Sequence, residues 1–290
     1  MTVLIHCIAG PTASGKSAYA LKLAKKYGGE IINADALQVY SGLQILSARP
    51  TLIDMDNIPH HLYGHVDPSV RYSSGRWLAE VDPLIIEILA RGHTPILVGG
   101  TGLYFKALTE GLAQIPEPES SAKREAQAIL DEQGIKALRK QAQRLDPIAT
   151  ARVLGDDPQR LLRIVNVALG TSKPLSHWQR ETKPILPRSA WQGSVLLPKR
   201  ENLYDKINAR FEHMVLNGGL EEAQCIYALK LSHTLPAMKA IGLRELIAHL
   251  EGKISLEQAI EDAMRETRRF SKRQYTWLRG QMKGWQHIEV

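Results

Sequence analysis

The 290-residue sequence has little of several features that are typical of particular protein classes. Its only cysteines, Cys7 and Cys225, lie far apart and outside any CxxC pair, which excludes a disulfide framework and a thiolate zinc site as organising features. No apolar run approaches the roughly 18 residues of a membrane-spanning helix. No basic segment precedes the first apolar stretch, as it would in a signal peptide. We therefore expect a protein of the reducing cytoplasm, with an organelle matrix as the alternative, and no membrane association.

The remaining composition is that of a globular chain long enough to bury a substantial core. Hydrophobic residues make up 44% of the sequence and charged residues 23%, and there is no low-complexity tract or internal repeat. The net charge is +7 and the isoelectric point is near 9.3. Such a charge attracts polyanions such as nucleic acid, although many basic proteins only gain solubility from it. Charge alone leaves both interpretations open.

The first third of the chain alternates short apolar runs with helical periodicity. The runs at residues 3–9, 31–34 and 95–98 are continuous, and each is followed by Gly or Asp. Helical periodicity covers residues 20–27 and 78–89. In the second segment Pro83 either kinks the helix or restarts it with Asp82 as the cap. Continuous strands separated by helices predict a parallel sheet that is covered by helices on both faces.

Residues 10–17 read GPTASGKS, which fits GxxxxGK[ST] between a predicted strand and a predicted helix. The loop glycines allow backbone N–H groups to turn inward and bind phosphate at a helix N-terminus. Lys16 supplies a mobile positive charge, and the Ser17 hydroxyl is a ligand for Mg²⁺. The motif predicts a ligand that carries phosphate. Because P-loops most often hold ATP or GTP, a small-molecule or nucleoside kinase is the first alternative.

The pattern changes near Gly111. Residues 116–189 hold no convincing strand and several short polar helices, one of which is predicted to begin at Asp157-Pro158 and to end at Gly170. A strand at residues 195–197 and a long helix from about Ser255 to Lys283 follow. We predict an α/β fold: a P-loop NTPase-like parallel sheet flanked by helices (residues 1–113 and 190–290), interrupted by an all-helical insertion domain (residues 114–189).

Seven blocks of the sequence resemble the bacterial tRNA dimethylallyltransferases, also called tRNA isopentenyltransferases. In family order they are GPTASGKS (10–17), NADALQVY (33–40), PHHLYGHVDP (59–68), VGGTGLYFKAL (98–108), DPQRLLR (157–163), MKAIGLREL (238–246) and KRQYTWLRG (272–280). The resemblance implies that dimethylallyl diphosphate alkylates N6 of the adenosine 3′ of the anticodon in tRNA and releases diphosphate. The P-loop would then hold the diphosphate of the donor, together with Mg²⁺.

The resemblance also assigns roles to single residues. Asp35 follows a predicted strand, where open α/β sheets bind ligands, and the family match makes this carboxylate the general base, although a turn or cap is the alternative. Thr101 lies in a Gly-rich turn at another strand end, and the family match places it at the tRNA substrate, although a helix cap is the alternative. We expect Gly99, Gly100 and Gly102 to let the backbone approach a ligand closely.

The implied sites can be stated by residue. Catalysis is assigned to Asp35, Thr101 and Lys16. Donor binding is assigned to Gly10, Pro11, Thr12, Ala13, Ser14, Gly15, Lys16, Ser17 and Arg210, with Ser17 on the metal. Contacts with tRNA are assigned to Asp35, Ala36, Leu37, Gln38, Thr101, Lys123, Gln159, Arg160, Leu161, Leu162, Arg163, Lys239 and Arg244. A solvated charged face is the alternative for the insertion residues among them.

Other features have plainer interpretations. We expect Trp277 to pack in the core rather than to stack on a base. His60 and His61 look like a metal pair, but adjacent residues point in different directions and no third ligand is apparent. The sequence departs from the family at Ala36, where a Ser is usual, and at Arg49, which replaces a Lys.

Two rival functions remain at this stage. A kinase would need an ATP-base pocket and a lid, for which the insertion could be mistaken. A non-enzymatic RNA-binding protein with a relic P-loop is weaker, since Lys16, Ser17 and Asp35 are all present. No obligate protein partner is evident.

Overall fold

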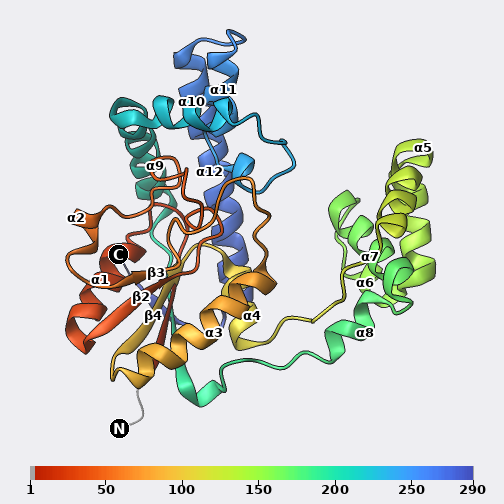
Figure 1. Cartoon of the computed structure of the whole chain (residues 1–290), viewed down its shortest axis with the longest axis horizontal. Coiled ribbons are helices and arrows are strands. Elements are labelled where there is room, and N and C mark those ends of the chain that lie inside the picture. The colour runs from red at the N-terminus through yellow and green to blue at the C-terminus, as the bar shows by residue number, and fades with distance from the viewer. Residues whose placement is uncertain (1–3, 290) are drawn as a thin grey trace. The chain divides into compact units, whose positions relative to one another are not determined.

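The computed structural model describes residues 4–289, which form two compact units (Figure 1). The first unit consists of the residues up to Thr109 and those from Leu186 onwards, and the second unit is Glu110–Ile185. The sequence predicted an insertion at residues 114–189; the compact helical unit begins and ends four residues earlier. No helix among residues 4–289 is long and apolar enough to cross a membrane.

The first unit is built on a six-stranded parallel sheet with the order β3-β2-β4-β1-β5-β6, as expected for this α/β class. The strands are β1 (Ile5–Ala9), β2 (Gly29–Asn33), β3 (His60–His61), β4 (Thr94–Gly99), β5 (Trp191–Leu196) and β6 (Gln286–Ile288). Every residue of β1, β2 and β4 is buried. Burial on both faces explains why these strands are continuous apolar runs in the sequence.

Helices surround the sheet (Figure 1). They are α1 (Lys16–Tyr27), α2 (Leu52–Met55), α3 (Ser74–Ala90), α4 (Gly102–Thr109), α9 (Arg200–Met214), α10 (Leu220–Ala228), α11 (Leu243–Leu250) and α12 (Leu256–Gln281). Short turns of other helix types are η1 (Arg188–Ala190), η2 (Val215–Gly219) and η3 (Ala237–Lys239). The helix α1 ends at Gly28, which adopts the left-handed conformation that glycine tolerates.

Pro83 lies inside a single helix, so of the two alternatives for this segment the restart at Asp82 is wrong. The helix α3 begins after Ser73, whose side chain accepts a hydrogen bond from the Arg76 N–H, and continues to Ala90. A proline in a helix interior removes one backbone hydrogen bond and costs about 3 kcal/mol. The face of α3 that includes Trp77 and Ile88 is fully buried along the whole helix. That continuous burial offsets the local cost.

The last long helix confirms the predicted element closely. It begins at Leu256, with the Ser255 side chain as its N-cap, and ends at Gln281. Trp277 is half-buried, and its ring fills the space that a side chain at position 102 would need. This tryptophan therefore packs against Gly102 on α4, in line with the expected core role.

The second unit is entirely helical, with no strand among residues 110–185, all of which the structure describes. Its helices are α5 (Ser120–Leu145), α6 (Pro147–Ala151), α7 (Pro158–Thr171) and α8 (Leu175–Arg180). The helix α5 is interrupted at Gly134, where φ is 82°. As predicted, α7 begins after Asp157, whose side chain accepts from the Arg160 N–H. Leu161, Ile164 and Val165 of α7 lie in the core of this unit.

Candidate active site

The P-loop connects β1 to α1 at the carboxyl edge of the sheet. The Gly10 N–H donates to the Gly99 carbonyl at 3.3 Å, and the Ser14 N–H donates to the Pro11 carbonyl at 3.3 Å. A Cβ at Gly10 would lie 2.5 Å from Ser14 Oγ, so the loop closes this tightly only with glycine there. The loop therefore curls over the N-terminus of α1, where a helix stabilises bound anions.

Two cations converge on this loop. The Lys16 Nζ donates to the Pro11 carbonyl at 3.2 Å. Burial lowers the pKa of Lys16 to about 8, against the attraction of Asp35 and with a further contribution from Arg210. Arg210 on α9 donates to Thr12 Oγ1 at 3.5 Å. Burial also lowers the pKa of Arg210, again opposed by Asp35. Two enclosed cations beside one loop can bind a phosphate group through charge-assisted hydrogen bonds.

A cavity of about 510 Å³ opens beside the loop. Its lining includes Lys16 and Ser17 of the P-loop and Arg210. The walls are largely apolar and come from several elements; they include Leu21, Ile31, Ile45, Val98 and Met214. A cavity that is lined by the P-loop cations and by many apolar side chains suits a small hydrocarbon that carries phosphate.

Asp35 follows β2 at the same edge of the sheet and is held by its neighbours. Its N–H donates to Asn33 Oδ1 at 2.9 Å, while Asn33 Nδ2 donates to the carbonyls of Asp35 and Leu62, each at 3.0 Å. One oxygen of the Asp35 carboxylate accepts from the Leu37 N–H at 3.0 Å. A Cβ placed at Gly100 would lie 3.3 Å from the other oxygen. The hydrogen bond from the Leu37 N–H thus orients the carboxylate, and the absence of a side chain at Gly100 leaves room beside its other oxygen.

Thr101 acts on the loop that carries this carboxylate. Its Oγ1 accepts from the Ala36 N–H at 2.9 Å, and its own N–H donates to the Ala34 carbonyl at 3.2 Å. The bond from Ala36 uses the backbone, so the departure from the family's serine leaves it unchanged. The structure brings Thr101 and Asp35 together as the sequence predicted.

The glycines around Thr101 serve a different purpose from the one predicted. A Cβ at Gly99 would collide with the backbone of Ala34, and one at Gly102 would collide with the Trp277 ring. The space beside each of these glycines is filled by the protein. Close approach of backbone to a ligand is therefore the wrong interpretation for Gly99 and Gly102. Gly99 instead permits close packing against Ala34, which follows β2, and Gly102 permits close packing against Trp277 on α12.

The loop at residues 43–49 forms one wall of the cavity and is held by residues that the sequence did not reveal. The Glu222 carboxylate on α10 accepts three backbone N–H groups, from Gln44 at 2.8 Å, Ile45 at 2.7 Å and Leu46 at 2.9 Å. Carboxylates that accept several N–H groups make strong, directional contacts. Nothing in the local sequence marks Glu222, because its partners lie 176 to 178 residues away.

Arg49 and Gln38 hold the same loop from within. The Arg49 guanidinium donates to the Tyr40 carbonyl at 3.2 Å and to Gln44 Oε1 at 2.8 Å. Its planar fork reaches both acceptors, which a lysine ammonium at this position would do less well. The Gln38 side chain donates to the carbonyls of Ser47 and Ala48 at 3.1 and 2.9 Å. Both side chains are thus engaged in shaping the cavity wall.

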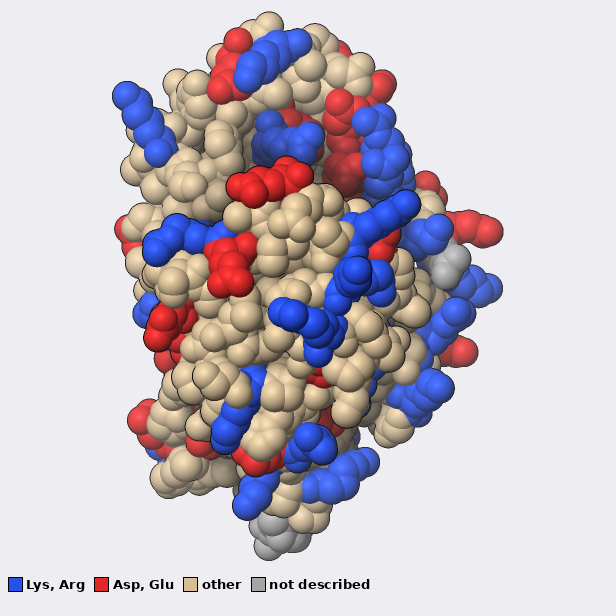
Figure 2. Space-filling view, turned by 90° about the vertical axis from the view of Figure 1, so that its right-hand side faces the viewer, with Lys and Arg blue, Asp and Glu red and all other residues tan. Residues whose placement is uncertain are grey.

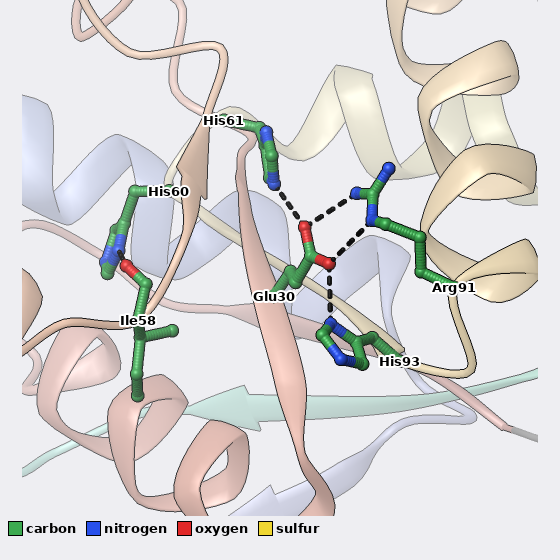
Figure 3. A network of polar contacts seen from close by, with 6 residues as sticks. All are labelled: Glu30, Ile58, His60, His61, Arg91 and His93. Atoms are coloured by element: carbon green, nitrogen blue, oxygen red, sulfur yellow. Dashed lines mark hydrogen bonds and ion pairs between the residues drawn. The ribbon is translucent and has the colours of Figure 1, made fainter.

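The paired histidines point in different directions (Figure 3). His61 contacts Glu30 at 2.6 Å, beside Arg91 and His93, which bind the same carboxylate. Burial opposes ionisation of Glu30, but hydrogen bonds from Arg91, His61 and His93 lower its pKa to about 2. His60 instead contacts the Ile58 carbonyl at 2.8 Å and lines the cavity. His61 is therefore a structural residue: together with Arg91 and His93 it binds the Glu30 carboxylate near the start of β2.

The candidate RNA residues of the helical unit divide by exposure. Gln159, Arg160 and Arg163 are exposed on α7, whereas Leu161 is fully buried and Leu162 is partly buried. The predicted tRNA contact of Leu161 is therefore wrong for its side chain, which packs in the core of the unit. Lys123 is paired with Glu117 at 2.7 Å.

A further basic surface of this unit was not predicted. A hollow of about 900 Å³ is lined by the second half of α5, including Lys136, Arg139, Lys140 and Arg144. In Figure 2, Lys and Arg side chains spread over the surface that faces the viewer, with Asp and Glu between them. The helical spacing of four residues between Lys136, Lys140 and Arg144 was a signal available in the sequence.

The other assigned residues lie on the first unit. Lys239 is exposed on η3, and Arg244 is exposed in the first turn of α11. Neither approaches Asp35 or the P-loop through a hydrogen bond or ion pair described for this structure. Their assignment to tRNA stays a prediction.

The sequence matches family models and curated proteins over most of its length. The family model for IPP transferase matches residues 38–281, and the model for isopentenyl transferase matches residues 3–61. The chain belongs to this family. It is 51% identical over 281 residues to the tRNA dimethylallyltransferase of Maricaulis maris, covering 97% of this chain and 91% of that protein. It is 50% identical over 287 residues to that of a Caulobacter species, covering 99% and 93%.

Solved structures of family members have the same fold. The full-length tRNA isopentenylpyrophosphate transferase of Bacillus halodurans is 32% identical, with a TM-score of 0.70 over 99% of this chain and 89% of that one. A eukaryotic dimethylallyltransferase acting on tRNA is 29% identical, with a TM-score of 0.85 over 99% of this chain and 74% of that one. The predicted fold class is thereby confirmed.

Proposed function

We propose that this family member transfers a dimethylallyl group from dimethylallyl diphosphate to N6 of the adenosine 3′ of the anticodon in tRNA, in the cytoplasm. The observation that carries the proposal is a cavity lined both by Lys16, Ser17 and Arg210 and by apolar side chains, together with the Asp35 carboxylate, whose charge acts on Lys16 and Arg210. The relatives' activity on tRNA supports the acceptor.

The P-loop end holds the leaving group. Diphosphate gains negative charge as the carbon–oxygen bond breaks, and preorganised N–H groups and cations stabilise that charge. Lys16 and Arg210 supply the positive charges on the two sides of the loop. The apolar wall from Ile45 to Met214 receives the hydrocarbon and excludes water from the reacting carbon.

Mg²⁺ fits the donor set at this end. Ser17 is exposed at the first turn of α1 and lines the cavity, so its hydroxyl is open to a metal that also binds diphosphate oxygens. Mg²⁺ typically takes few protein ligands and several from substrate phosphates and water. When bound there, it would neutralise charge on the diphosphate.

Asp35 serves the acceptor. The N6 lone pair forms the new bond to the allylic carbon as the electron pair of the broken bond leaves with diphosphate, and the N6 proton passes to the Asp35 carboxylate. The target adenosine must leave its stack in the anticodon loop to reach the cavity. Thr101 holds the Ala36 N–H and thereby fixes the carboxylate's direction.

A direct assay separates this function from a kinase. The protein is incubated with Mg²⁺, unmodified tRNA and labelled dimethylallyl diphosphate, and in parallel with γ-labelled ATP and nucleosides. We expect label from the allyl donor in RNA and no transfer of γ-phosphate. Phosphoryl transfer without allyl incorporation would contradict the proposal.

A further inference from the structure

One glutamine from the last helix contacts both the P-loop and the turn that carries Thr101. Gln274 lies on α12 and is almost fully buried. Its Oε1 accepts from the Thr12 N–H at 3.0 Å, and its Nε2 donates to the Gly100 carbonyl at 2.9 Å. A single amide therefore binds the P-loop and the turn between β4 and α4 at once.

The two segments that Gln274 contacts serve different reactants in the proposed reaction. Thr12 lies in the loop that is proposed to hold the leaving diphosphate. Gly100 directly precedes Thr101, whose hydroxyl binds the Ala36 N–H next to Asp35. A side chain at Gly100 would meet both the Gln274 amide and the Asp35 carboxylate. Hydrogen bonds and the covalent chain thus connect the P-loop, through Gln274 and the Gly100-Thr101 turn, to the segment that carries Asp35.

Burial makes this bridge stiff. A buried amide is costly unless both its donor and its acceptor are bonded, and the two segments bound by Gln274 supply one partner each. If the P-loop moved relative to the Gly100 turn, one buried polar group would lose its partner. Water replaces such a partner only poorly at a site this enclosed.

We propose that Gln274 is a positioning residue that sets the distance between the leaving diphosphate and the Asp35 carboxylate. This inference rests on the proposed transfer reaction, and it assigns no contact between Gln274 and either substrate. Reacting atoms must be held at about 3–3.5 Å, and a displacement of about 1 Å costs roughly 100-fold in rate. Loss of the bridge should therefore slow the chemical step while each end still binds its ligand.

Two substitutions separate bridging from simple polarity. Gln274→Met keeps the length and removes the amide, whereas Gln274→Asn keeps the amide but is one methylene too short to reach both partners. We expect kcat to fall about 10- to 100-fold in both, with the KM for dimethylallyl diphosphate and the affinity for inorganic diphosphate changed less than about threefold. Gln258→Asn, on the exposed surface of the same helix, should leave all three values unchanged.

Either of two kinetic results would overturn the inference: wild-type kcat in Gln274→Asn, or a loss confined to the donor KM. A structural measurement needs no turnover. In the unliganded Gln274→Met protein, amide hydrogen exchange should quicken in the P-loop and in the Gly99–Gly102 turn, and stay unchanged in β5. Unchanged exchange at both bridged segments would contradict the bridge, whatever the wild-type activity shows. Wild-type allyl transfer, measured alongside, tests the proposed function separately.

Discussion

The P-loop site and the helical unit carry the same kinds of charged side chain in different surroundings. Lys16 and Arg210 are enclosed enough that burial lowers the pKa of each, and both donate hydrogen bonds to the P-loop. On α7, by contrast, Arg160 is exposed and paired with its neighbour Asp157 at 3.3 Å. Enclosed charges act over short distances with little screening, whereas exposed charges are weakened by water and salt. The first arrangement suits chemistry on one group, and the second suits attraction of an extended polyanion.

The largest expected effect comes from the carboxylate. Asp35→Asn keeps the shape and the acceptor for the Leu37 N–H but removes the base. We expect kcat to fall about 1,000-fold, within the usual range for loss of a general base. Affinity for inorganic diphosphate, measured by calorimetry, should change less than threefold. Retention of more than a tenth of the wild-type kcat would contradict the role of Asp35 as base.

The next effect is on pH dependence. Because burial lowers the pKa of Lys16 to about 8, the free protein loses this positive charge as the pH rises through 8. The donor diphosphate binds the protonated form, so kcat/KM for the donor should fall above pH 8 by up to about tenfold per pH unit. Lys16→Arg, which stays charged throughout this range, should abolish that fall. An unchanged pH profile in Lys16→Arg would show that another group causes it.

Glu222 tests whether the cavity wall matters as much as the cavity's charged end. Glu222→Gln leaves one oxygen to accept from three N–H groups and sets an amide donor against them. We expect the donor KM to rise about tenfold, with kcat nearly unchanged. The adjacent Glu221→Gln is exposed and should have no effect. Equal effects of the two substitutions would mean that the loop does not depend on the carboxylate.

The smallest effects should come from the helical unit. Arg160→Ala and Arg163→Ala should each raise the KM for tRNA only about two- to fivefold, and the combined variant should show a weaker dependence of tRNA binding on salt. Filter binding across a salt series measures this. An unchanged salt dependence in the combined variant would show that α7 does not contact the phosphate backbone.

How much could be predicted differs between the parts of the site. The P-loop is contiguous, so its motif predicts both the structure and the phosphate ligand, and the cap Asp157 predicts where α7 begins. Glu222 and Gln274 act on partners 176 or more and 174 or more residues away, and no local pattern reports a contact of that kind.

The errors have physical causes as well. Pro83 is tolerated because one face of α3 is continuously buried, which outweighs a local helix breaker. Gly99 and Gly102 looked like a ligand-binding turn, yet the groups that fill their space come from β2 and α12. Leu161 lies within a matched block, but its helical face is the buried one.

One experiment separates the chemical role of the P-loop site from the RNA-binding role of the helical unit. The single-turnover rate of allyl transfer is measured at saturating donor and tRNA, for Asp35→Asn and for the protein that combines Arg160→Ala with Arg163→Ala. We predict that the first rate falls about 1,000-fold and that the second stays within about twofold of wild type. A wild-type rate in Asp35→Asn, or a comparable loss in the α7 variant, would contradict the division between chemistry at the P-loop site and RNA binding on the helical unit.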